Sequence, residues 1–96
     1  MNVGRFLKGT FLEQQLDSLE EEEYRKTFEA AVKMIEERRK IDPSFSIKDL
    51  KRLLRTEYEV EGNDQFGRGR AFELELSATI AAHEYVLSKW EKEGIE

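Results

Sequence analysis

The sequence predicts an all-α fold: a single helical domain over residues 1–96, built as a small bundle of three main helices and a short N-terminal helix. Two observations predict it. Apolar residues recur at three- and four-residue spacing along most of the chain, and the only strong punctuation is Pro43 and the glycine-rich stretch 62–70. A chain of 96 residues has room for one hydrophobic core, and its ten aromatic residues argue against disorder.

The first element is a short helix near residues 5–16. Leu12, Leu16 and Leu19 follow helical spacing, whereas Gly9 and Thr10 weaken the start of the segment. The segment is apolar enough to lie over one of the longer helices.

A long helix is expected over residues 18–40. Ser18 and Glu21 form a capping box, and the acidic run that follows suits the positive end of the helix dipole. The apolar face of this helix comprises Tyr24, Phe28, Ala31, Val32 and Ile35. Asp42 and Pro43 end the helix, because the residue before a proline is pushed out of the helical conformation.

A shorter amphipathic helix is expected over residues 46–61. Ser46 and Asp49 give it a second capping-box start. Its apolar face carries Ile47, Leu50, Leu53, Leu54 and Tyr58, and its opposite face carries Lys48, Lys51, Arg52 and Arg55.

The last helix, expected over residues 70–92, has two apolar faces. The wider face comprises Phe72, Leu76, Thr79, Ile80, His83, Val86, Leu87 and Trp90, and the narrower one is the row Leu74, Ala78, Ala81 and Tyr85. A helix with two apolar faces needs two neighbours.

Two interpretations of the row Leu74, Ala78, Ala81 and Tyr85 stay open. The row is covered by another part of the same chain, such as residues 5–16, or it is a seam for self-association, in which two alanines let a second copy approach closely. The second interpretation predicts a homodimer.

The net charge of −5 is unevenly distributed. Residues 38–70 are net +3, and the flanking segments are net −4 each. Within the middle segment Lys48, Lys51, Arg52 and Arg55, followed by Arg68 and Arg70, are candidates for contact with an anion or a nucleic acid. Four acidic residues, Asp49, Glu57, Glu59 and Glu61, interrupt this patch, and no Asn or Gln on that face is placed to read bases. A solvated helix face is therefore the alternative interpretation.

Catalytic and metal-binding signals are sparse. His83, the only histidine, lies on the core face of the last helix without the companions of a metal site, so a structural, hydrogen-bonded role is expected. The stretch Gly67 to Arg70 matches neither a dinucleotide fingerprint nor a P-loop. No metal ligand set and no cofactor is predicted.

Composition excludes further classes. The absence of cysteine removes disulfides, thiolate metal sites and cysteine nucleophiles. No stretch approaches the roughly 20 apolar residues of a membrane span, so no membrane association and a cytoplasmic location are expected.

These observations predict a non-enzymatic helical protein–protein interaction module or small regulator that associates with itself through the last helix. They do not identify its protein partner. One alternative is a nucleic-acid-binding regulator that uses the basic face of helix 46–61. A second is a magnesium-dependent nucleotide hydrolase, for which Glu20 with Glu23, and Glu36 or Glu37, give a partial glutamate arrangement.

Overall fold

A computed structural model describes residues 18–62 and 69–94. It contains three helices, α1 (Ser18–Ile41), α2 (Ile47–Gly62) and α3 (Arg70–Glu93), and no strand in either described range. The all-α prediction is confirmed, and the three main helices begin and end within one residue of their expected bounds. The short N-terminal helix expected near residues 5–16 falls outside the described residues.

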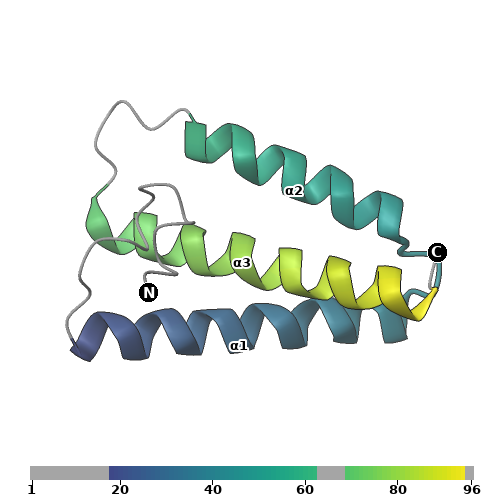
Figure 1. Cartoon of the computed structure of the whole chain (residues 1–96), viewed down its shortest axis with the longest axis horizontal. Coiled ribbons are helices and arrows are strands. Elements are labelled where there is room, and N and C mark those ends of the chain that lie inside the picture. Colours follow the sequence, from purple (N-terminus) through teal and green to yellow (C-terminus); the bar gives the residue numbers. More distant parts are fainter. Residues whose placement is uncertain (1–17, 63–68, 95–96) are drawn as a thin grey trace, which may run out of the picture.

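Helix α3 is the central element of the bundle. Both α1 and α2 pack against it, and in Figure 1 it lies between them. Glu20 pairs with Arg70 near the start of α1 and α3, and Glu36 pairs with Lys89 near their ends, so these two helices run in the same direction. Helix α2 runs in the opposite direction. Lys51, near its start, pairs with Glu91 near the end of α3, whereas Glu57, further along α2, pairs with His83 in the middle of α3. The two neighbours that the apolar faces of α3 require are therefore both helices of this chain.

The turn between α1 and α2 is built by short side chains. The Asp42 carboxylate accepts hydrogen bonds from the backbone N–H of Ser44 at 3.1 Å and from its hydroxyl at 2.6 Å. The Phe45 N–H donates to the Asp42 carbonyl at 2.9 Å and closes the turn. The Ser46 N–H donates to the Asp49 carboxylate at 2.8 Å, and the Asp49 N–H donates to the Ser46 hydroxyl at 3.4 Å. This reciprocal pair is the predicted capping box of α2.

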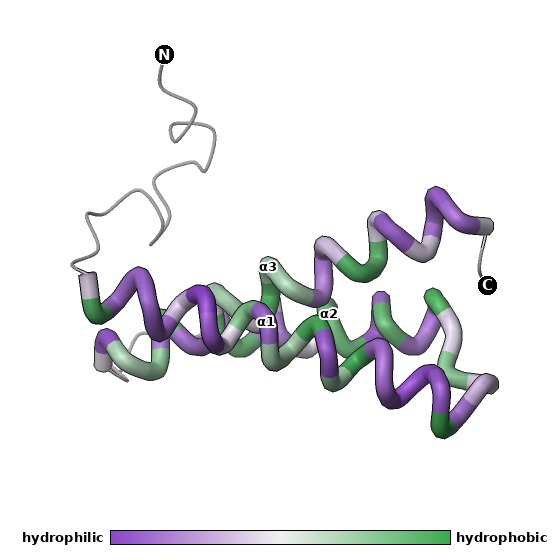
Figure 2. The backbone as a smooth tube through the Cα atoms, turned by 90° about the horizontal axis from the view of Figure 1, so that it is seen from below, coloured by the Kyte–Doolittle hydropathy of each residue, from purple (hydrophilic) through white to green (hydrophobic). Residues whose placement is uncertain are grey.

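The main hydrophobic cluster lies at the end of the bundle where α1 turns into α2. It comprises the buried residues Ile35, Phe45, Leu50, Val86 and Trp90. The rings of Phe45 and Trp90 meet edge to face, with centroids 6.2 Å apart and planes at 79°. Figure 2 shows hydrophobic and hydrophilic residues alternating along each helix, as expected when one side of each helix faces this cluster.

The ends of α3 depend on glycine. Gly69 precedes the helix with a φ of 99°, and Gly94 ends it with a φ of 77°, both in the region that L-residues with a side chain rarely adopt.

Within the described ranges, no helix combines the length and the apolar character that crossing a membrane requires.

Candidate functional site

The row Leu74, Ala78, Ala81 and Tyr85 faces α1. The flanking positions Arg70 and Lys89, on the same side of α3, pair with Glu20 and Glu36 of α1. Leu74 and Ala78 are buried, Ala81 is partly buried, and Tyr85 is 50% exposed. Self-association through Leu74 and Ala78 stays a prediction, and it would require α1 to move away from α3. In the folded bundle Tyr85 is the residue of this row that a partner can contact.

An open groove lies beside Tyr85, between α1 and α3, and has a volume of about 280 Å³. Its apolar lining consists of Phe28, Val32 and Tyr85, and we call it the α1–α3 groove. The rings of Phe28 and Tyr85 lie with their centroids 5.9 Å apart and their planes tilted by 52°. Its rim carries Glu29, Lys33 and Glu36, so an apolar strip is bordered by charges of both signs.

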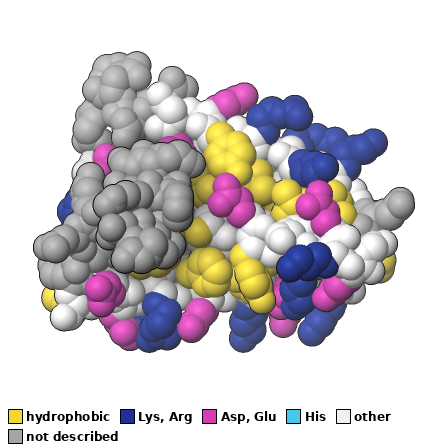
Figure 3. Space-filling view, viewed as in Figure 1, with side chains coloured by type: hydrophobic (Ala, Val, Ile, Leu, Met, Phe, Trp, Pro, Cys, Tyr) yellow, Lys and Arg dark blue, Asp and Glu magenta, His cyan; other side chains and the backbone are white. Residues whose placement is uncertain are grey.

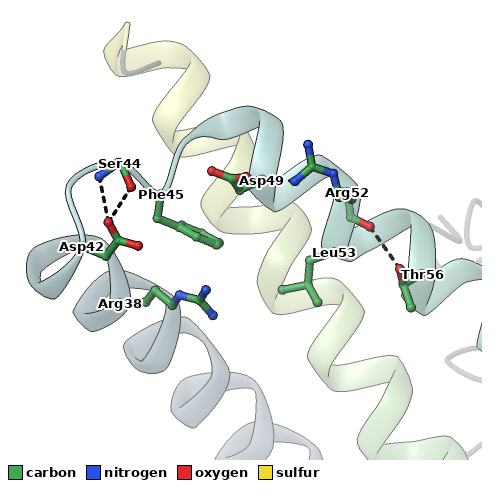
Figure 4. A pocket seen from close by; sticks show the side chains of 8 residues that line it. All are labelled: Arg38, Asp42, Ser44, Phe45, Asp49, Arg52, Leu53 and Thr56. Carbon is green, nitrogen blue, oxygen red and sulfur yellow. Dashed lines mark hydrogen bonds and ion pairs between the residues drawn. The ribbon is translucent and has the colours of Figure 1, made fainter.

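A second and larger hollow, of about 410 Å³, lies between the end of α1 and the first turns of α2 (Figure 4). It is lined by Arg38, Asp42, Ser44, Phe45, Asp49, Arg52, Leu53 and Thr56. We call it the α1–α2 pocket. Arg38 lies over the Phe45 ring at 4.6 Å, and Arg52 pairs with Asp49 at 3.0 Å. The pocket thus holds two arginines and two aspartates that already have partners within the chain.

The two carboxylates of the α1–α2 pocket stay ionised. Hydrogen bonds from the Ser44 hydroxyl and backbone lower the pKa of Asp42 below its usual value. The backbone N–H of Ser46 has the largest effect on Asp49 and lowers its pKa as well. A carboxyl group with a lowered pKa is a poor general acid near neutral pH, so neither aspartate suits proton donation to a substrate.

The basic residues expected on α2 do not form an uninterrupted patch. Lys51 pairs with Glu91 of α3 at 3.6 Å, and Arg52 pairs with Asp49. Lys48 and Arg55 are both exposed on the same helix. Arg70 pairs with Glu20, and Arg68 lies outside the described residues. Lys and Arg side chains gather over the upper right of the molecule in Figure 3, and acidic side chains lie near them.

His83 is a buried structural residue, as the sequence predicts. Its Nδ1 lies 2.9 Å from the Glu57 carboxylate, and the two side chains are only 7% and 14% exposed. This contact joins α3 to α2 within the bundle. Residues 18–62 and 69–94 contain no group of three or more His, Asp or Glu side chains placed to hold a metal ion.

Sequence reasoning placed Phe28 only on a buried face of α1 and treated Arg39 only as part of a basic helix end. In the structure Arg39 donates a hydrogen bond to the Phe45 carbonyl at 2.8 Å and lies over the Trp90 ring at 5.2 Å. Phe28 lines the α1–α3 groove together with Val32. The available signal was Val32, which widens the apolar stripe of α1.

Comparisons of the chain with protein-family models, with curated proteins and with solved structures gave no significant match. The geometry of the described residues therefore carries the functional proposal.

Proposed function

We propose that this chain is a non-enzymatic interaction module that contacts a partner polypeptide through the α1–α3 groove. The observation that carries the proposal is the open strip formed by Phe28, Val32 and Tyr85, with two aromatic rings at its surface. Aromatic side chains are enriched in protein interfaces, and a groove between two helices suits an amphipathic helix. The charged rim of Glu29, Lys33 and Glu36 would fix the orientation of the partner.

The α2 surface supports a nucleic-acid-binding function less well. Lys51 and Arg52 have carboxylate partners in the chain, and a phosphate contact would have to displace them. The total charge of −5 also opposes approach to a polyanion.

Site-specific photocrosslinking tests the proposal. A photoreactive aromatic amino acid is placed at Tyr85 of the full chain, and the matched control carries it at Glu59, an exposed residue of α2. We expect the Tyr85 position to give one reproducible polypeptide adduct, mapped to a single peptide and suppressed by Phe28→Asp in the same chain. Equal adduct yields from positions 85 and 59, or an adduct at position 85 that Phe28→Asp leaves unchanged, would contradict the proposal.

A further inference from the structure

The outward face of α1 is almost entirely charged. It comprises Glu22, Arg25, Lys26, Glu29, Lys33, Glu36, Glu37 and Lys40. Seven of these eight residues are exposed, and Glu36, which pairs with Lys89, is partly buried at the edge next to α3. Along the lower edge of Figure 3, where α1 lies, acidic and basic side chains alternate.

The signs of these charges are arranged about Ala31, the middle of the helix. Positions at equal distances before and after Ala31 carry opposite charges: Glu29 and Lys33, Lys26 and Glu36, Arg25 and Glu37, Glu22 and Lys40. All eight charged residues of the face belong to such pairs. The face is therefore complementary to itself when one copy is reversed.

Helix direction decides what this pattern means for a second copy. Two α1 helices that lie antiparallel and cross at Ala31 bring each charge opposite its unlike counterpart. Two parallel helices in register bring every charge opposite its own kind, and like charges repel. Glu29 and Lys33 lie one helical turn apart on the same side of α1, so both face the partner at the centre of the antiparallel arrangement.

We propose that two copies of this chain associate through α1, with the helices antiparallel about a two-fold axis at the level of Ala31. The inference rests on the proposed function and identifies the partner polypeptide as a second copy. At the centre Glu29 of each copy pairs with Lys33 of the other, so the contact occurs twice, as two-fold symmetry requires.

Apolar surface borders the charged face on both sides. The α1–α3 groove, with Val32 and Phe28, runs along one edge, and the 70%-exposed Met34 lies toward the other. A second copy laid across α1 therefore lies beside the α1–α3 groove. The existing bonds of Arg25 to Glu22 at 2.7 Å and to Glu29 at 3.2 Å lie between exposed side chains of one helix, so they can rearrange at little cost. Because the central contacts are exposed ion pairs, the dissociation constant should rise with salt.

Charge reversal in two separate variants tests the arrangement. Glu29→Lys makes the centre of the face entirely positive, and Lys33→Glu makes it entirely negative. Each variant alone should dimerise at least about tenfold more weakly than the natural chain, because two attractive contacts become repulsive. An equimolar mixture of the two variants should recover the dimer, since the positive centre of one variant then meets the negative centre of the other. Analytical ultracentrifugation of the full chain measures all three samples, with Glu59→Lys on α2 as the control.

Recovery in the mixture cannot arise from altered helix stability, because each variant keeps its own altered helix. A wild-type chain that is monomeric at millimolar concentration, single variants that dimerise as the natural chain does, or a mixture that stays monomeric would each overturn the inference. If one of these three results is found and position 85 gives a photoadduct with a different protein, self-association through α1 is wrong. The proposed function, contact with a partner polypeptide through the α1–α3 groove, is then still supported.

Discussion

Arg39 shows how one residue at a helix end can organise a bundle. Its guanidinium donates to the Phe45 carbonyl at 2.8 Å and lies over the Trp90 ring, so it ties the last turns of α1 to the α1–α2 turn and to α3. The sequence shows Arg38, Arg39 and Lys40 as three equivalent cations suited to the helix dipole. Only the arrangement of the three helices distinguishes Arg39 from its neighbours.

At the same scale, the capping box of α2 makes stability depend on acid pH. The pKa of Asp49 is lowered from its usual 3.8 in the folded chain, so the carboxylate contributes stability above pH 3.8 that is lost as the pH falls through the lowered value. We expect Asp49→Asn to be less stable than the natural chain at about pH 7 and the difference to narrow toward about pH 2. Thermal unfolding followed by circular dichroism at a series of pH values measures the difference.

The matched control for this prediction is Glu59→Gln, which removes an exposed carboxyl group from the same helix. If the difference in unfolding temperature between Asp49→Asn and the natural chain stays the same down to about pH 2, the Asp49 carboxylate does not stabilise α2 as described.

At the scale of elements, small residues on α3 set how closely α1 approaches. Ala78 has no exposed surface, whereas Ala71, two turns earlier on the same helix, is exposed. We expect Ala78→Leu to destabilise the chain by about 1–3 kcal/mol, because added methylene groups in a packed interface force neighbouring side chains out of place. Ala71→Leu should change the free energy of unfolding by less than about 0.5 kcal/mol. Urea denaturation of the two variants gives the comparison, and equal losses would show that α3 is not packed as described.

The elements were predictable because each carries local signals. Pro43 and the capping box of Ser46 and Asp49 place the boundary between α1 and α2, and the two apolar faces of α3 predict two neighbours. The identity of those neighbours was not predictable, because helical periodicity gives the face that is buried and not the element that covers it. The row from Leu74 to Tyr85 was therefore assigned to a second copy or to residues 5–16, whereas α1 lies along it.

The candidate site was less accessible from sequence than the fold. His83 was recognisable as structural, since a lone histidine within an apolar face needs only one hydrogen-bond partner. The α1–α3 groove joins Phe28 and Val32 to Tyr85, more than 50 residues away in the sequence, and no local pattern records such a contact. The order of charges along α1 is visible in the sequence. That these charges form one self-complementary surface follows only once the structure shows which face of α1 is exposed.

At the scale of the whole molecule, the distribution of charge and apolar surface favours association of like chains. One side of the bundle carries the self-complementary face of α1 beside the α1–α3 groove, whereas the cations of α2 are partly neutralised by carboxylates of the same chain. A domain of this size buries a modest core, so association would also add to its stability.

The most direct test of antiparallel association through α1 is a set of distances between the two copies. The chain has no cysteine, so a single cysteine can carry a spin label at Glu22, Met34 or Lys40 without interference. With a helical rise of about 1.5 Å per residue, the two copies of a position are offset along the helix axis by about 9 Å for Met34 and by about 27 Å for both Glu22 and Lys40. Pulsed electron paramagnetic resonance should therefore give a shorter spin–spin distance for Met34 than for the other two positions. The same separation at all three positions, or no coupling between copies at any of them, would contradict the account.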